Sequence, residues 1–459
     1  MADFRRQVWF IRASIATLDL QANDVERPGY EPVWPRHMLS HAELAPRLVE
    51  EARRIGDRLE ELSVREGDNA AWIGFAHVNK TWSLDAVAED LYAGAPGIIL
   101  ALAYLGAFSG RTRGNGGFDK YTGLARHALN TLRARLQITG KQVHSIGAFD
   151  GWGGIIYVLA HLSALWGDQE LIAYASTVVE RIPELVEQDE SLDIIGGCAG
   201  CIGALLVLDR VSPSQKIVAV AAQCGDRLLA RAQRVQNGIG WFSNVKTAKP
   251  ITGFAHGAAG IAWALLELSA RTGNQKYRET ALEALAYEHA EYSSAAGNWA
   301  ENAPGSGDTG PSMAWCYGAP GIGMSRSRAL QHLADSGVSE NLRHMVREDL
   351  ERAIAATLER GPGSNHSLCH GDLGNLDFLL QAAEVSGDQQ LTRKVNELTN
   401  QILASIEEYG WLSGVPLRVE SPALMNGLAG VCYGLLRLAG PDRVPSVLTL
   451  APPLSWSCV

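Results

Sequence analysis

A short glycine motif, G-x-x-G, recurs seven times along the chain, and an apolar run with helical spacing follows each copy. The copies begin at Gly94, Gly151, Gly197, Gly257, Gly318, Gly371 and Gly427. The shortest interval is 46 residues (Gly151 to Gly197) and the longest is 61 (Gly257 to Gly318), so each unit has room for two helices and two loops. Long repeats of this kind are typical of arrays in which each helix pair covers the apolar face of the next.

The segments between the copies mix apolar and charged residues at helical spacing, whereas the runs after the glycines are more apolar. We therefore predict inner helices directly after the glycines, and outer helices with one solvated face in segments 124–137, 170–188, 214–233, 275–293, 341–359 and 389–408. The predicted fold class is all-α: an α/α toroid, a double ring of seven helix pairs, with an N-terminal helical extension. An open helical solenoid has the same repeat, so the repeat alone does not decide closure.

The composition excludes several classes of protein. The formal net charge of −10 argues against a broad attraction to nucleic acid phosphates. No apolar run approaches the roughly 20 residues that a membrane-spanning helix needs. The N-terminal segment has no clear signal-peptide cleavage site, so a cytoplasmic protein is predicted. Seven cysteines form an odd set in a long chain, which argues against a disulfide framework and favours reduced thiols.

Three repeats carry possible metal ligands at the same place, just before the first glycine. Cys316 and Cys369 lie two residues before it, and His256 and His370 lie one residue before it. In a ring, these side chains would meet at one mouth. Cys316, Cys369 and His370 form a suitable zinc set, because zinc accepts thiolate and imidazole ligands, and three protein ligands leave a fourth position open.

Another pair of cysteines, Cys198 and Cys201, stands in a C-x-x-C pattern around the second glycine of its repeat. Such a pair can be a redox site or half of a zinc site. No partner C-x-x-C lies nearby in the sequence, so packing between inner helices is the favoured interpretation.

Three motifs of the chain resemble those of the lanthionine synthetase C-like cyclases. They are F-A-H-G-A-A-G at 254–260, W-C-Y-G-A-P-G at 315–321 and C-H-G-D-L-G-N at 369–375. The resemblance extends over about residues 90–453 and implies an α/α toroid around a zinc site. It is strongest toward the C-terminal cyclase region of the class II, bifunctional lanthipeptide synthetases, which also share the patterns at 91–94, 149–154 and 444–447.

The opening segment 8–14, V-W-F-I-R-A-S, resembles the end of the dehydratase region that precedes the cyclase in those synthetases. We therefore predict two parts. Residues 1–80 form an N-terminal extension resembling the linker after a dehydratase domain, and residues 81–459 form the zinc-dependent lanthionine cyclase toroid. The sequence is compatible with an excised cyclase part and with a stand-alone protein.

The resemblance also implies roles for single residues. It places the zinc ligands at Cys316, Cys369 and His370, the acid/base histidine at His256, and a functional aspartate of a D-x-x-x-G pattern at Asp193. Asp150 is a lesser candidate. Some stand-alone members carry an arginine shortly before the Trp-Cys pair, but residues 311–314 of this chain contain none, so no role is assigned to such an arginine.

The resemblance implies a cyclase that adds peptide cysteine thiols to dehydroalanine or dehydrobutyrine, giving lanthionine or methyllanthionine rings. The expected cofactor is Zn²⁺. The expected partners are a dehydrated precursor peptide and a dehydratase, fused or separate, with no nucleic acid and no membrane span. Without its dehydratase, the chain is not expected to remove water from serine or threonine.

Two other functions stay open at this point. A zinc protein that binds a thiol such as glutathione without cyclase activity would keep the three ligands but would not need His256 or Asp193, which would then be a buried histidine and a helix N-cap. A helical-ring hydrolase would need two facing carboxylates and would leave the Cys-Cys-His set unexplained. Its carboxylates would come from Asp150, Asp193, Asp308 and Asp372.

Overall fold

The computed structural model describes residues 2–22, 29–78, 81–109, 119–244, 246–303, 312–334 and 337–454. Each of seven inner helices begins at the residue after the first glycine of a repeat. They are α3 (Ala95–Ser109), α5 (Trp152–Trp166), α8 (Cys198–Val211), α10 (Ala258–Thr272), α12 (Ala319–Leu333), α14 (Asp372–Ser386) and α16 (Leu428–Ala439). These helices are almost wholly buried, which agrees with their apolar sequences.

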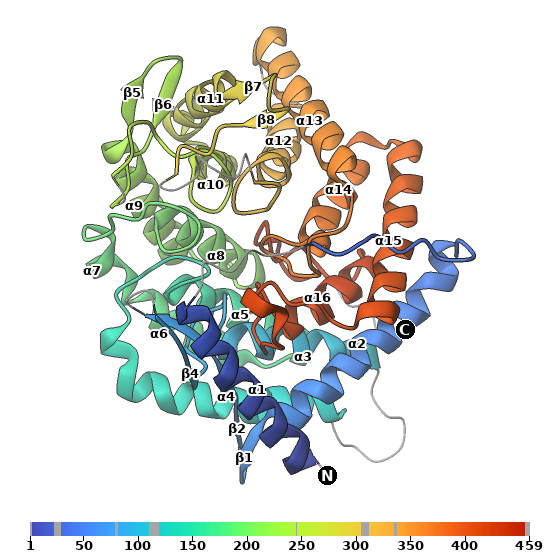
Figure 1. Cartoon of the computed structure of the whole chain (residues 1–459). Coiled ribbons are helices and arrows are strands. Elements are labelled where there is room, and N and C mark those ends of the chain that lie inside the picture. The colour runs from blue at the N-terminus through green and yellow to red at the C-terminus, as the bar shows by residue number, and fades with distance from the viewer. Residues whose placement is uncertain are drawn as a thin grey trace.

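Outer helices surround the inner ring (Figure 1). They are α4 (Lys120–Thr139), α6 (Gln169–Val179) with the short α7 (Ile182–Val186), α9 (Gln215–Arg231), α11 (Gln275–Ala290), α13 (Glu340–Arg360), α15 (Gln389–Tyr409) and α2 (His41–Leu62). Each packs against the inner helix of its own pair, and α2 packs against α16. The predicted outer helices are therefore confirmed, and a seventh comes from the N-terminal region.

A closed circuit of backbone hydrogen bonds joins the seven loops that precede the inner helices. Its donor and acceptor pairs are Tyr92 to Phe149 (3.0 Å), Phe149 to Ile195 (3.1 Å), Ile194 to Ala255 (3.1 Å), Ala255 to Cys316 (3.4 Å), Trp315 to Cys369 (3.0 Å), Cys369 to Met425 (2.9 Å) and Met425 to Tyr92 (2.9 Å). The last bond links the seventh loop to the first, and α16 packs against α3. The array is therefore a closed toroid and not an open solenoid.

The second glycine of every repeat is required by close packing. A Cβ atom built on it would lie 1.8–2.5 Å from the carbonyl oxygen of the residue six positions earlier, as at Gly260 (1.9 Å from Phe254 O) and Gly154 (2.4 Å from Ala148 O). Real Cβ atoms do not approach an oxygen so closely, so only glycine lets the loop fold back over the first turn of its helix. The second glycine of each G-x-x-G copy is thus needed for the close packing of the loops at the ring mouth.

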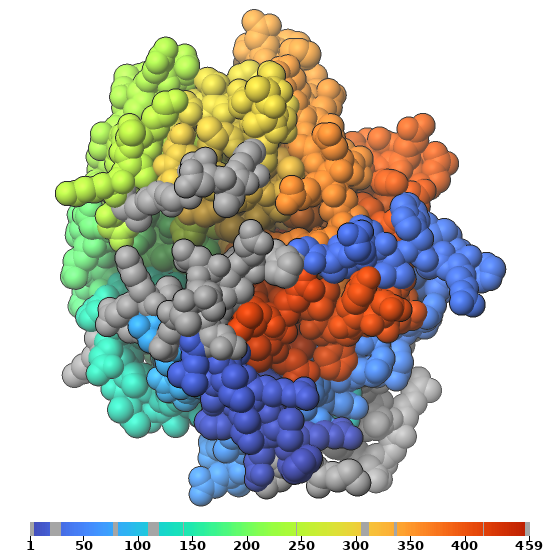
Figure 2. Space-filling model, in the orientation of Figure 1, coloured from blue at the N-terminus to red at the C-terminus, as the bar shows by residue number. Residues whose placement is uncertain are grey.

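The N-terminal region lies on the outside of the ring. Helix α2 buries Leu44, Leu48 and Ile55 completely, and Ser40 and Glu43 form a capping box at its start. Helix α1 (Ala2–Ala22) lies within the predicted N-terminal extension, and its Trp9 Nε1 donates to the carbonyl of Glu420 (2.9 Å). Figure 2 shows α1 on the surface of the molecule. The domain boundary at residue 81 stays a prediction.

The strands in the described residues form four two-stranded antiparallel hairpins. They are β1 (Val64–Glu66) with β2 (Asn69–Ala71), β3 (Ile73–Val78) with β4 (Thr81–Ala86), β5 (Gln233–Val235) with β6 (Gly238–Gly240), and β7 (Tyr292–Ser293) with β8 (Asn298–Trp299). Two short 3₁₀ helices, η1 (Gly140–Gln142) and η2 (Pro416–Arg418), complete the elements. None of the helices in the described ranges is long and apolar enough to cross a membrane.

Candidate active site

The two predicted cysteine ligands are neighbours in the hydrogen-bonded circuit at the ring mouth. Cys316 precedes α12 and Cys369 precedes α14, and both line a cavity of about 510 Å³. The pKa of the Cys316 thiol is raised well above its ordinary value by the hydrogen bond with Cys369 and by burial, although His370 and His256 oppose this shift. The two thiols therefore interact with each other in this cavity.

His370 lines the same cavity, and its orientation suits a ligand. Its Nε2 lies 2.8 Å from the carbonyl oxygen of Gly414. Since a carbonyl can only accept, Nε2 carries a hydrogen, and in the neutral ring this leaves the lone pair on Nδ1. Metal-binding histidines commonly donate their second ring nitrogen in this way, which fixes the tautomer.

The donor types at the mouth fit Zn²⁺, which accepts thiolate sulfur and imidazole nitrogen. Within the described part of the chain, however, no three His, Cys, Asp or Glu side chains lie close enough together to form a complete metal-binding group. The structure thus brings Cys316, Cys369 and His370 to one cavity, and zinc binding stays a prediction.

His256 and Asp193 form a pair beside these residues. His256 Nδ1 lies 2.8 Å from Asp193 Oδ2, and Asp193 Oδ1 accepts a hydrogen bond from the backbone N–H of Gly196 (2.8 Å). The ring of His256 stacks on Tyr317, with centroids 5.4 Å apart. The N-cap of α8 is Gly197, so Asp193 does not cap that helix. Its carboxylate orients the imidazole, which leaves Nε2 as the ring nitrogen available to a bound molecule.

The pKa of His256 reflects two opposing effects. Burial disfavours the charged imidazolium, but the hydrogen bond to Asp193 and the negative charge of Asp193 outweigh it and raise the pKa. A raised pKa favours the charged imidazolium, which is the form that a general acid needs.

Carboxylates line another part of the cavity. Asp90 Oδ1 accepts hydrogen bonds from the backbone N–H groups of Ala93 (2.7 Å) and Gly94 (3.2 Å). Burial and, less strongly, the nearby Asp150 raise the pKa of Asp90 to about 6. Burial and Asp193 raise the pKa of Asp150. Asp150, the lesser candidate, thus lies on the cavity wall.

Sequence reasoning missed Asp90, Tyr92 and Tyr317 as cavity residues. A signal for Asp90 was present, because Asp90 and Gly94 repeat the D-x-x-x-G spacing of Asp193 and Gly197. Tyr317 directly follows Cys316, in the repeat position that His256 and His370 occupy in their own copies. Comparing the copies position by position would have identified both residues.

The remaining candidates lie elsewhere or outside the described residues. Asp372 is buried and accepts a hydrogen bond from the Tyr30 hydroxyl (2.8 Å), and it does not line the cavity. Asp308 lies outside the described residues. Cys198 and Cys201 are free thiols that are fully buried in the core, which confirms the packing interpretation.

Comparisons with known proteins identify the family and the fold. A family model described as lanthionine synthetase C-like protein matches residues 85–449. The lacticin 481/lactococcin biosynthesis protein LcnDR2 of Lactococcus lactis subsp. lactis is 29% identical over 206 residues, which cover 42% of this chain and 21% of that protein. The match thus spans about a fifth of the length of this relative.

A solved structure of nisin cyclase superposes with a TM-score of 0.63 at 16% sequence identity. The superposition covers 88% of this chain and 96% of that chain. At this identity the likeness supports the fold, and it agrees with the toroid that the backbone circuit closes.

Proposed function

The chain belongs to the lanthionine synthetase C-like family, and on that premise we propose that it is a zinc-dependent cyclase that forms lanthionine and methyllanthionine rings in a dehydrated peptide. One observation carries the proposal: the His256–Asp193 pair and the Cys316, Cys369 and His370 side chains belong to one site at one ring mouth. In the proposal, the two cysteines and His370 hold the metal that activates a thiol, and His256 is the proton donor beside them.

The proposed reaction joins a peptide cysteine to a dehydroalanine or dehydrobutyrine. The sulfur forms a bond to the β-carbon, the carbon–carbon double bond becomes single, and a proton is added at the α-carbon. The thiol loses one proton and the α-carbon gains one, so the peptide changes neither in mass nor in oxidation state. This is a Michael-type addition, and it needs a nucleophilic thiolate and an acid.

We assign the zinc ligands to Cys316, Cys369 and His370. When bound there, Zn²⁺ would lower the pKa of an incoming cysteine thiol, which is near 8.5 in a free cysteine. The hydrogen bond from His370 Nε2 to the Gly414 carbonyl supports this assignment, because it directs Nδ1 to act as the ligand.

We assign the proton donor to His256. Its Nδ1 is bound to Asp193, so the proton would leave from Nε2 toward the α-carbon of the reacting residue. The Asp193 carboxylate stabilises the charged imidazole before the transfer and holds the ring in one orientation. A thiol-binding protein without cyclase activity would not need this pair.

The remaining parts of the proposal concern the surroundings. The substrate is a precursor peptide that a dehydratase, fused or separate, has already modified. All six described cysteines are free thiols, which supports a reducing compartment such as the cytoplasm.

The test combines metal analysis with a peptide assay. The purified chain is analysed for zinc and then incubated with a synthetic peptide that contains one cysteine and one dehydroalanine. We expect about one zinc per chain, loss of the free thiol and no change in peptide mass. Zinc with an unchanged thiol would favour the thiol-binding protein, and absence of zinc from the intact chain would contradict the proposed site.

A further inference from the structure

The loop that carries Asp193 contains a second buried carboxylate, Asp189, which the proposed mechanism does not use. We propose that Asp189 is a positioning residue that holds Asp193 against His256 and thereby sets the rate of the cyclisation. The inference rests on the proposed function, and its test below includes a measurement that does not depend on activity.

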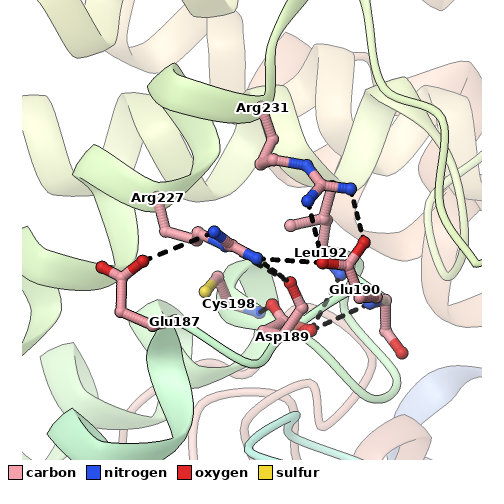
Figure 3. Close-up of polar contacts among 8 residues, drawn as sticks. Glu187, Asp189, Glu190, Leu192, Cys198, Arg227 and Arg231 are labelled. Carbon is pink, nitrogen blue, oxygen red and sulfur yellow. Dashed lines mark hydrogen bonds and ion pairs between the residues drawn. The ribbon is translucent and has the colours of Figure 1, made fainter.

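Asp189 binds the loop on both sides of Asp193. Its Oδ1 accepts hydrogen bonds from the backbone N–H groups of Ser191 (2.9 Å) and Leu192 (3.2 Å), and its Oδ2 accepts one from Cys198 (2.7 Å). Figure 3 shows Asp189 beside Leu192 and Cys198. One carboxylate therefore joins the residue directly before Asp193 to the first turn of the helix that follows it.

The backbone at Leu192 explains why the loop needs the hydrogen bonds of the Asp189 carboxylate, which we call the clamp. Leu192 is fully buried and has a φ of 64°, in the left-handed region that side chains other than glycine rarely adopt. This conformation costs about 1–2 kcal/mol and persists only where the surroundings enforce it. The N–H of Leu192 is one of the groups that Asp189 binds, so the clamp acts at the strained residue.

The outer face of the loop is attached to α9 (Figure 3). Arg227 Nη2 donates to the backbone carbonyl of Asp189 (2.9 Å), and Arg227 and Arg231 both pair with Glu190. Glu190 is half exposed, so these ion pairs contribute little by themselves. The carboxylate of Asp189 is the stronger restraint, because its hydrogen bonds from Leu192 and Cys198 are buried away from water.

Two hydrogen bonds connect this loop to His256 and to the residue before it. The N–H of Ile194 donates to the carbonyl of Ala255, which directly precedes His256, while Asp193 binds the imidazole itself. If Leu192 relaxes, Asp193 and Ile194 move with it. A displacement of about 1 Å at a catalytic group can cost about 100-fold in rate.

The test is a double-mutant cycle on the turnover number for ring formation. Asp189→Asn keeps the shape of the side chain but replaces one acceptor oxygen by a donor that faces an N–H group. We expect it to lower kcat by about tenfold to 100-fold in the wild type, with little change in KM. In a chain that already carries Asp193→Ala, the same substitution should have almost no further effect, because the group it positions is gone.

Asp209 provides the matched control. It is also buried and accepts a hydrogen bond from a backbone N–H, that of Ser214 (2.9 Å), but it lies at the opposite end of α8 and pairs with Arg271. Asp209→Asn should lower thermal stability and leave kcat unchanged. If Asp189→Asn slows the wild type and the Asp193→Ala chain by the same factor, or leaves the wild type unchanged, the positioning role is wrong.

A nuclear magnetic resonance measurement separates this inference from the proposed function. In chains with ¹⁵N-labelled histidine, the Nδ1 proton of His256 should give a hydrogen-bonded signal that Asp193→Ala abolishes. Asp189→Asn should shift or broaden it, and Asp209→Asn should not. An unchanged signal in Asp189→Asn overturns the inference even if no variant cyclises. If Asp189→Asn does not fold, Arg227→Gln replaces it in both measurements. We then expect a smaller loss of kcat and a smaller change of the His256 signal, and again no loss of kcat in the chain that carries Asp193→Ala.

Discussion

The loops before α10, α12 and α14 bring imidazole and sulfur to the ring mouth, whereas the loops before α3, α5 and α8 bring carboxylates. His256, Cys316 and Cys369 belong to the first half, and Asp90 and Asp150 belong to the second. Both halves line one cavity, and their backbones belong to the same hydrogen-bonded circuit. The halves therefore differ in chemistry while they share one architecture.

The position two residues before the first glycine shows this difference most clearly. Around the ring it holds Tyr92, Phe149, Ile195, Ala255, Cys316, Cys369 and Met425. All seven take part in the backbone circuit, but only two carry thiols. The scaffold decides where these side chains point, and the identity of the side chain decides what each half can do. The His256–Asp193 pair then connects the halves.

Removing one sulfur from the first half should have the largest effect. We expect Cys316→Ala to lose its zinc and to lower the rate of ring formation by more than about 100-fold, since loss of a ligand exceeds the effect of losing a supporting contact. Zinc analysis and mass spectrometry of the peptide measure both. Cys432→Ala, which removes a buried thiol from α16, should keep both properties. Full activity of Cys316→Ala would remove this cysteine from the site.

The second prediction concerns the connection between the halves. His256→Ala should keep its zinc and lower kcat by about 10²–10⁴-fold, the usual contribution of a general acid. His289→Ala is the control, because His289 also pairs with an aspartate, Asp349 (2.7 Å), but belongs to the outer helix α11. Ring formation at the normal rate by His256→Ala would contradict its role as proton donor.

The third prediction tests whether the two halves share one scaffold. Gly154→Ala and Gly321→Ala place a Cβ 2.4 Å and 2.1 Å from a carbonyl oxygen, one in each half. Each substitution should lower the free energy of unfolding by about 1–3 kcal/mol, and the two losses should be similar. Gly123→Ala, in an open position on α4, should raise it by about 0.5–1 kcal/mol. Denaturant unfolding measures all three, and a large cost in only one half would show unequal scaffolds.

The smallest effect is expected from the carboxylate half. The pKa of Asp90 is about 6 in the folded chain against an ordinary value of 3.8, so the folded state binds this proton more tightly than the unfolded state does. Stability should therefore fall as the pH rises from about 4 to 6. Asp90→Asn, which cannot ionise, should be more stable than the wild type at pH 8 and should lose this advantage below pH 4. Thermal melts across this range measure the difference, and an advantage independent of pH would contradict the assignment.

Local patterns in the sequence determined most of the fold class and much of the site. The spacing of apolar residues predicted the inner and outer helices, and the G-x-x-G copies marked the first residue of each inner helix. Cys316, Cys369, His370 and His256 were found because they share a phase within the repeat. These signals are local, since helical periodicity and helix starts depend on residues that are close in sequence.

The tertiary structure decided everything that depends on distant segments. Closure rests on the hydrogen bond from Met425 to Tyr92, and α2 supplies the outer partner of α16 although almost the whole chain separates them. The clamp of Asp189 on a left-handed Leu192 is likewise invisible to periodicity. The repeat in the sequence predicts that each helix pair packs on the next. Whether the seventh pair meets the first depends on the rotation between successive pairs, summed over the whole array.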